Sequence, residues 1–148
     1  TKATEAWAGY NKELAKQVEM LMVNSNSCTA SFTQMAALAA LKGPQDSAEE
    51  MKAAFKERRD WLVAALNDIP GITCCLPKGA FYAFPDISSF GLDSKTFCDR
   101  LLEEAHVVCV PGSAFGAVGE GHMRIAYTAK TEDIIEAMRR IREFCAKL

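Results

Sequence analysis

One arginine inside a predicted β-strand is the residue of this sequence best suited to bind a ligand. Residues 119–127 alternate in polarity, which predicts a strand with Met123, Ile125 and Tyr127 on one face and Arg124 on the other. A guanidinium in such a strand is costly to bury unless an anion meets it, and its planar fork matches a carboxylate. Arg124 is therefore a candidate carboxylate-binding residue. The alternative is a common edge-strand arginine that reaches solvent or pairs with a glutamate of the chain.

Two neighbouring segments carry the other features with chemical potential. Residues 111–116 read as a glycine-rich loop that lacks the spacing of a phosphate-binding motif, yet it would let a substrate come close to Arg124. Residues 79–84 contain three aromatics that are most simply core residues, although one of them could wall a pocket. Ser113 lacks the surroundings of a hydrolase nucleophile, and His106 is most simply structural.

Composition excludes several classes of partner. The chain has 148 residues, of which 49% are hydrophobic and 24% charged, as in an ordinary soluble domain. Its formal net charge of −2 gives no electrostatic basis for binding nucleic acid or an anionic membrane. No apolar run approaches the roughly 18 residues of a membrane span. The start of the chain lacks the apolar core of a signal peptide and is not a methionine, so we expect a processed or partial chain.

The six cysteines are expected to be free, buried thiols. Cys109 lies in an apolar run and Cys145 on an apolar helix stripe, while Cys74 and Cys75 are adjacent and would point to opposite faces of a strand. These positions favour a reducing, cytoplasmic compartment over a disulfide framework. No cysteine pair has C-x-x-C spacing, and the two histidines are not spaced with cysteines as zinc ligands would be, so no metal site is expected.

Apolar periodicity predicts an α+β fold with helices on one face of a small mixed or antiparallel sheet. The predicted helices cover residues 11–23, 31–41, 47–67, 95–105 and the segment after 131. The predicted strands cover residues 72–76, 80–84, 107–110 and 119–127. The helix at 47–67 is long enough to form a spine between two units, and the composition changes near residues 43–44, the one candidate domain boundary.

Three local details follow from the same patterns. Residues 72–76 and 80–84 are expected to pair as a hairpin across the turn at residues 77–79. The β-branched run at residues 107–110 is typical of a fully buried strand. Ser94 is expected to cap the helix that follows it.

Four stretches together resemble the C-terminal part of the class I and II aminotransferases, which are pyridoxal-phosphate enzymes of fold type I, and in particular the aspartate aminotransferase branch. Residues 77–85 resemble the pattern P-x-G-A-F-Y-x-F-P, and residues 108–116 resemble V-x-V-P-G-x-x-F-G. Residues 119–127 resemble the arginine-bearing strand of the family, and residues 24–34 the segment that leads to its long spine helix.

The resemblance implies an enzyme that moves an amino group between an amino acid and a 2-keto acid, with pyridoxal 5'-phosphate as cofactor. It implies that Arg124 binds the substrate α-carboxylate and, more weakly, that Phe81, Tyr82 and Asn26 border the pocket. It further implies a homodimeric transferase of amino acid metabolism. In that reading residues 43–148 are the C-terminal small domain and residues 1–42 are a remnant of the large cofactor domain.

The departures from the family concern the cofactor. Its Schiff-base lysine and its other cofactor-binding residues would lie upstream of the matching region. Residues 7–10 only echo a family stretch, and Lys2 is too close to Tyr10 to be that lysine. We therefore expect no catalytic residue in this chain, weak cofactor binding and no amino transfer by these residues alone. The alternatives are a non-catalytic module that binds a carboxylate metabolite and another fold type I pyridoxal-phosphate enzyme.

Overall fold

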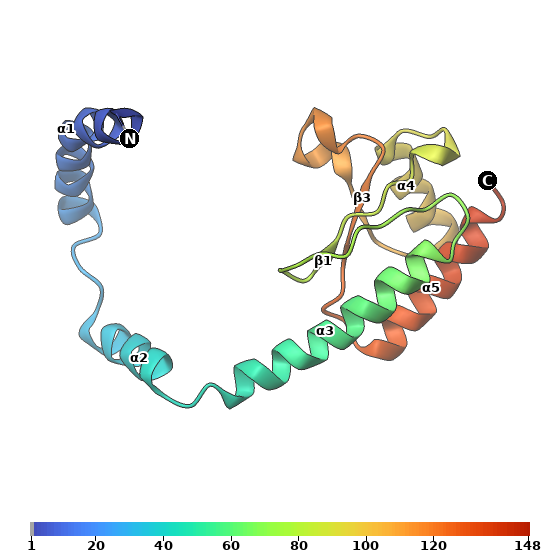
Figure 1. The fold of residues 1–148 in the computed structure, drawn as a ribbon, viewed down its shortest axis with the longest axis horizontal. Coiled ribbons are helices and arrows are strands. Elements are labelled where there is room, and N and C mark those ends of the chain that lie inside the picture. Colours follow the sequence, from blue (N-terminus) through green and yellow to red (C-terminus); the bar gives the residue numbers. More distant parts are fainter. Residues whose placement is uncertain (1) are drawn as a thin grey trace. The chain divides into compact units, whose positions relative to one another are not determined.

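The structure is a computed structural model that describes residues 2–148, with side-chain surroundings described from residue 12 onward. The chain divides into two compact units, Thr1–Gln45 and Asp46–Leu148, and each is considered by itself (Figure 1). In the part of the chain that is described, no helix is both long and apolar enough to cross a membrane.

The first unit consists of two helices, whose described side chains from residue 12 onward form no core. Helix α1 covers Lys2–Ser25 and helix α2 covers Ser31–Lys42. No residue from 12 to 42 is buried, and the predicted apolar stripe of α1 is exposed at Leu14 and Leu21. Apolar burial is the main favourable term in folding, so the described part of this unit gains little stability from its own packing.

The second unit has the predicted α+β architecture. Its helices are α3 (Asp46–Asn67), α4 (Ser94–Ala105) and α5 (Thr131–Cys145). Its strands are β1 (Tyr82–Ala83), β2 (Val110–Pro111) and β3 (Met123–Ala126). They form an antiparallel sheet in the order β1-β3-β2, so β3 is central. Helix α5 packs against α3 and α4, and α4 packs against β2 (Figure 1).

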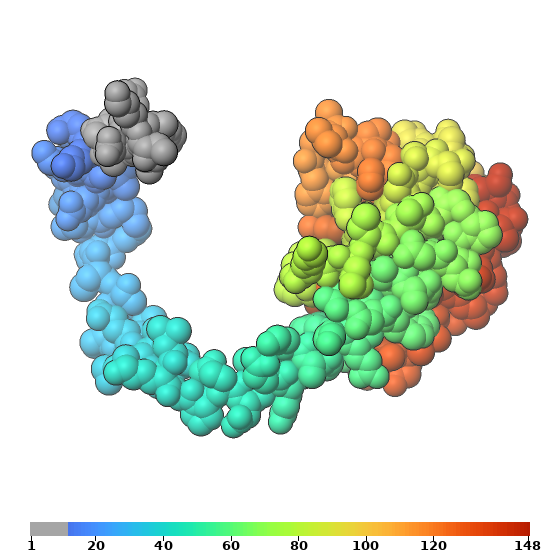
Figure 2. All heavy atoms as spheres, in the orientation of Figure 1, coloured from blue at the N-terminus to red at the C-terminus, as the bar shows by residue number. Residues whose placement is uncertain are grey.

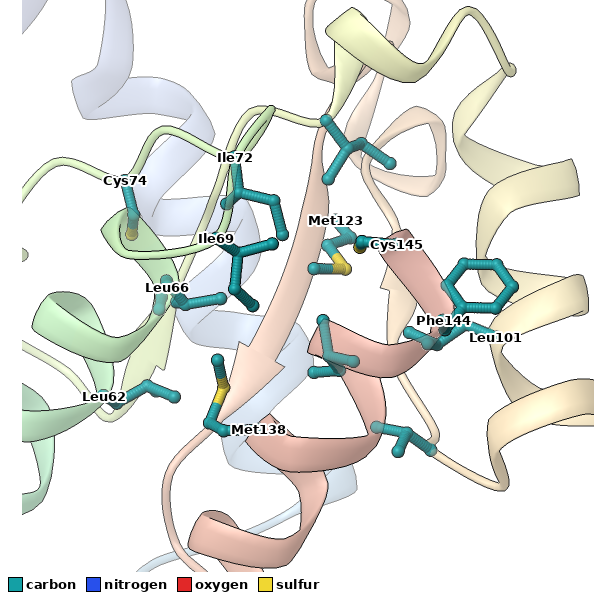
Figure 3. Close-up of a cluster of buried hydrophobic side chains, with 14 of the residues drawn as sticks. Leu62, Leu66, Ile69, Ile72, Cys74, Leu101, Met123, Met138, Phe144 and Cys145 are labelled. Atoms are coloured by element: carbon teal, nitrogen blue, oxygen red, sulfur yellow. The ribbon is translucent and has the colours of Figure 1, made fainter. Parts of the chain in front are cut away.

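The core fixes which face of β3 points inward. Side chains from all three helices and from β3 converge in one buried cluster (Figure 3). Leu66 of α3 and Leu101 of α4 are fully buried, and Met123 of β3 has no exposed surface. Each such side chain contributes about 1.5–3 kcal/mol on burial. With the buried side chains of Met123 and Tyr127 held inside, Arg124 must lie on the opposite face of the strand.

The predicted long helix is present, but only its second half joins the core. Residues 46–54 at the start of α3 are all exposed, whereas Leu62, Val63 and Leu66 near its end are buried. In Figure 2 the first half of α3 extends beyond the packed part of the second unit. The described residues of this unit thus leave residues 46–54 of its longest helix in contact with solvent.

The predicted hairpin is wrong. Strand β1 pairs with β3, and residues 72–76 contribute only an isolated bridge between Thr73 and Asp86. The side chain of Asn67 explains why residues 72–76 do not form the predicted strand. Asn67 accepts a hydrogen bond from the backbone N–H of Cys74 at 2.8 Å and donates one to its carbonyl at 3.0 Å. These bonds satisfy backbone groups that a strand ladder would otherwise use.

The prediction of a fully buried strand at residues 107–110 is also wrong. Only Val110 pairs with β3, and the side chain of Val108 is 76% exposed. His106, in the left-handed conformation at φ 56°, ends α4, and the N–H of Val107 donates to the Leu101 carbonyl. This helix cap uses the N–H of Val107 and delays the start of the strand.

All six cysteines are free thiols, of which Cys28 and Cys75 are exposed rather than buried as expected. Burial raises the pKa of Cys98 to about 11 and that of Cys145 to about 11. Both thiols are therefore protonated near neutral pH and are poor nucleophiles. They serve as small apolar core residues.

Candidate functional site

Arg124 occupies the middle of the central strand, on the face turned away from the core. It pairs with Val110 of β2 in the antiparallel register and is half-buried. Its neighbours in sequence, Met123 and Ile125, belong to the core or pack against it. The strand therefore fixes the backbone of Arg124 firmly while its side chain points out of the sheet.

Two aromatic rings lie against the guanidinium. The Arg124 Cζ atom is 4.3 Å from the ring centroid of Tyr82 and 4.7 Å from that of Phe115. Both distances are well within the roughly 6 Å at which a cation is attracted to the face of an aromatic ring. Tyr82 belongs to β1, and Phe115 ends the short 3-10 helix η2 (Gly112–Phe115) that follows β2. The rings thus come from the two segments that flank β3.

Arg124 forms no ion pair with any described carboxylate. The nearest acid in sequence, Glu120, is engaged elsewhere. Its Oε1 atom accepts hydrogen bonds from the backbone N–H groups of Ser94 at 2.6 Å and Gly121 at 3.0 Å, which lower the pKa of the Glu120 carboxyl. Pairing with an internal glutamate is thus not observed among the described residues. The five N–H donors of the guanidinium remain available to an external acceptor.

Two further rings extend the aromatic surroundings. Phe84 stacks on the imidazole of His122 at 5.1 Å with an interplanar angle of 11°, and it meets Phe115 edge-on at 6.2 Å. We call Tyr82, Phe84, Phe115, His122 and Arg124 the Arg124 cluster. Its single guanidinium and apolar ring faces suit a small molecule that carries an anionic group.

The loop that carries Phe115 is held by a close backbone crossing. A Cβ atom added at Gly112 would lie 1.9 Å from the carbonyl oxygen of Gly119, and one added at Gly119 would lie 2.1 Å from that of Gly112. Only glycine permits this approach. A second 3-10 helix, η3 (Ala117–Gly119), completes the loop. The path of the backbone around Phe115 is therefore fixed by contacts that no other residue type could make.

A hydrogen-bond network ties the same loop to α4. The Ser94 Oγ atom donates to Glu120 Oε2 at 3.0 Å and accepts from the backbone N–H of Ser113 at 3.3 Å. The prediction that Ser94 caps α4 is wrong, because Asp93 is the cap and accepts from the N–H of Thr96 at 2.9 Å. Ser94 is fully buried and joins the helix start to both ends of the loop.

The other predicted pocket residues lie outside the Arg124 cluster. Phe81 is 40% exposed and contacts Tyr82 and Phe55, with ring centroids 4.6 Å and 6.3 Å away. Asn26 belongs to the first unit, where its side-chain nitrogen lies 3.5 Å from the sulfur of Met22. Tyr82 therefore contacts Arg124, whereas Phe81 contacts Tyr82. Asn26 belongs to the other unit.

Sequence reasoning missed three members of the cluster. Phe84 and Tyr82 alternate onto one face of the strand, so the pairing of β1 with β3 would have indicated Phe84. His122 is two residues from Arg124, so the alternation of the strand would have indicated it as well. Phe115 had no such signal, because its position depends on the path of an irregular loop.

A separate groove of about 340 Å³ lies beside α5. Its walls include Val108, Ile125 and Ala137, with Arg140 at its polar side, and Arg124 is not among them. The groove does not share the cationic group that makes the Arg124 cluster a candidate site.

Comparison with known proteins identifies the family. The model of the family "aminotransferase class I and II" matches residues 5–141. An aspartate aminotransferase from Pyrococcus horikoshii is 49% identical over 114 residues, which are 76% of this chain and 29% of that protein. An aspartate aminotransferase from Rhizobium meliloti is 40% identical over 152 aligned positions, covering 96% of this chain and 37% of that protein.

Solved structures agree in fold. An aromatic aminotransferase from Pyrococcus horikoshii superposes with a TM-score of 0.81 at 40% identity, over 86% of this chain and 35% of that chain. This chain thus spans about a third of the length of the relatives that it matches. The family model nevertheless covers nearly all of its residues. The chain therefore belongs to the class I and II aminotransferases.

Proposed function

We propose that this chain supplies the substrate-carboxylate site of a pyridoxal-phosphate-dependent aminotransferase, an enzyme that moves an amino group between an amino acid and a 2-keto acid. Membership of the family supports the reaction class. One observation carries the role of Arg124. Its half-buried guanidinium lies against two rings and has no ion-pair partner among the described carboxylates. Such a group is best stabilised by an anion from outside the chain.

In this proposal Arg124 binds the α-carboxylate through two parallel N–H···O bonds. Hydrogen bonds to charged groups contribute about 1.5–3 kcal/mol each, more than neutral ones. The strand holds the backbone of Arg124, so the bound acid has a defined position relative to the sheet. Arg124 thereby orients the substrate, and orientation of this kind lowers the barrier of the reaction that follows.

The family implies pyridoxal phosphate as the cofactor, but the Arg124 cluster does not fit that group by itself. Covalent attachment of an aldehyde cofactor requires a lysine amine. The cluster contains one guanidinium, one imidazole and three aromatic rings, and no amine. These residues suit the substrate carboxylate, and we assign no catalytic residue to this chain.

The finer parts of the proposal concern the pocket and the assembly. We propose that Phe81 borders the substrate, supported by its exposure and its stacking on Tyr82. Asn26 is proposed to border the same pocket on the strength of the sequence resemblance. A homodimer is supported by the exposed apolar side chains of residues 12–42, which need a covering surface. The free thiols support a cytoplasmic enzyme.

Substitution of Arg124 tests the carboxylate role. In the cofactor-loaded enzyme that carries this chain, Arg124→Ala should raise KM for amino acids by roughly ten- to more than a hundredfold, because a charged bidentate contact is lost. Arg124→Lys keeps the positive charge but lacks the planar fork of the guanidinium. Its KM should therefore lie between those of the wild type and Arg124→Ala. Cofactor binding, followed by its absorbance, should be unaffected. An unchanged KM would remove Arg124 from the site.

The 148 residues alone provide a second test. Mixed with pyridoxal phosphate, this chain should neither bind the cofactor tightly nor transfer an amino group from alanine or aspartate to 2-oxoglutarate. The readouts are cofactor absorbance and keto-acid production. Amino transfer by the isolated chain would contradict the assignment of no catalytic residue to it. Tight binding of a dicarboxylate in a calorimetric titration, without cofactor, would favour a non-catalytic binding module.

A further inference from the structure

Arg124 lacks the contacts that usually hold an arginine side chain in one conformation. No hydrogen bond or ion pair joins its guanidinium to a described residue. A side chain with several rotatable bonds would then sample many rotamers and lose that freedom on binding a ligand. The contacts observed are those with the faces of Tyr82 and Phe115.

The ring contacts place Arg124 Cζ over the faces of Tyr82 and Phe115, and no described residue accepts a hydrogen bond from the guanidinium N–H groups. A cation lies over the face of an aromatic ring, whereas a carboxylate meets the N–H groups in the plane of the guanidinium. The two kinds of contact use different parts of the group and do not compete. Tyr82 and Phe115 can therefore restrict the side chain while its N–H groups make no hydrogen bond to a described acceptor.

The two rings are themselves positioned by the fold. Tyr82 lies in β1 opposite Ala126 of β3, so its place relative to Arg124 is set by strand register. Phe115 is 51% exposed, and burial does not hold it. Its loop is instead fixed by the crossing of Gly112 and Gly119 and by the bonds that Ser94 makes.

We infer that Tyr82 and Phe115 are positioning residues that hold the Arg124 guanidinium ready for the substrate carboxylate. This inference rests on the proposed function of Arg124. The rings fix the orientation of the cation before binding, so the substrate loses less affinity to ordering of the side chain. The crossing of Gly112 and Gly119 and the hydrogen bonds of Ser94 act indirectly, because they hold the loop that carries Phe115.

Kinetics of leucine variants test the inference in the cofactor-loaded enzyme. Phe115→Leu and Tyr82→Leu keep an apolar side chain but remove the ring. Each should raise KM for amino acids roughly two- to fivefold, with kcat changing less than KM. The conservative variants Phe115→Tyr and Tyr82→Phe should recover most of the lost affinity. Val118→Ala, at a 97% exposed position of the same loop, is the control and should leave KM unchanged.

Arginine side-chain NMR separates the two proposals. In the same protein labelled at arginine nitrogen, the Arg124 Nε–H signal should be shifted by the ring currents and should move toward the position of an unstructured arginine in either leucine variant. If Arg124→Ala leaves KM unchanged, the proposed function fails, whatever the spectrum shows. If Arg124→Ala raises KM but the leucine variants change neither KM nor the signal, the positioning role alone is wrong. A Phe115→Tyr enzyme as impaired as Phe115→Leu would also contradict it.

Discussion

Arg124 shows how far a single residue can be interpreted from a sequence. Alternation of residue types placed it on the outer face of a strand, and β3 has that arrangement, with Met123 buried behind it. Alternation could not tell whether a glutamate of the chain would neutralise the guanidinium. The structure gives the missing information, because Glu120 is bound to Ser94 and Gly121 while Tyr82 and Phe115 contact the arginine.

A core leucine provides a prediction about stability at the same scale. Leu66 has no exposed surface, and Leu66→Ala in the full chain should lower the free energy of unfolding by about 2–5 kcal/mol. Leu102 of α4 is 46% exposed, so Leu102→Ala removes the same atoms with a much smaller loss of stability. Urea unfolding followed by circular dichroism measures both. Equal losses would mean that the buried cluster does not hold the second unit together.

The loop at residues 112–120 makes a prediction at the scale of an element. Gly112→Ala places a Cβ atom 1.9 Å from a backbone oxygen of the crossing segment, which cannot move without displacing the loop. We expect this variant to displace Phe115 and raise KM for amino acids roughly as much as Phe115→Leu does, about two- to fivefold. Gly79→Ala is the matched control, because nothing lies within 4 Å of a Cβ atom added there. The prediction is wrong if the two alanine variants behave alike.

Helix α5 makes a prediction about pH. Hydrogen bonds from Arg139 and Arg140 lower the pKa of Glu136 to about 2. A carboxyl whose pKa is lower in the folded state stabilises that state above its unfolded pKa of about 4.5, and this stability is lost as the pH falls toward 2. Glu136→Gln should therefore flatten the fall of the melting temperature between pH 4.5 and 2. An unchanged slope would show that Glu136 does not titrate in this way.

Helices α3 and α4 were predictable because each has a long amphipathic pattern, whereas α1 begins at Lys2 and not at residue 11 as expected. The spine helix expected at residues 47–67 is α3, and the one expected at 95–105 is α4, within one residue at each end. The short strands were not predictable to the same degree. Their limits depend on the amide of Asn67 and on the helix cap at His106, which take up backbone groups that the sequence pattern assigns to a sheet.

At the scale of the whole molecule, the two units differ in how they are stabilised. The second unit has a buried core drawn from its three helices and from β1 and β3, whereas residues 12–42 contain no buried side chain. Exposed apolar residues there include Phe32 at 77% and Leu41 at 84%. Apolar area of this extent is typical of a surface that another part of a protein, or another chain, covers.

Limited proteolysis should reveal that difference. Segments with few buried contacts open at little free-energy cost and are cut first. In the full chain, we expect early cleavage within residues 12–45 and a resistant fragment that begins near Asp46, both identified by mass spectrometry. First cuts inside residues 62–145 would contradict this distribution of stability.

The sequence motifs predicted the family of this chain but not the groups that carry out its reaction. The four stretches at residues 24–34, 77–85, 108–116 and 119–127 together indicated the aminotransferases, and the match over residues 5–141 confirms the family. The groups that carry out the reaction could not be predicted from these motifs. Attachment of the cofactor requires an amine that the Arg124 cluster lacks, so the role proposed for Arg124 concerns substrate orientation and not the chemical step.

The most direct test of the central claim compares an amino acid with its α-carboxamide as ligands of the cofactor-loaded enzyme. The two ligands differ at the group that Arg124 is proposed to bind, because the carboxamide is uncharged and has an NH2 donor in place of one acceptor oxygen. The wild-type enzyme should favour the carboxylate by roughly tenfold or more, and Arg124→Gln should bring that ratio close to one. A ratio that is the same in the wild type and in Arg124→Gln would show that the carboxylate is recognised elsewhere.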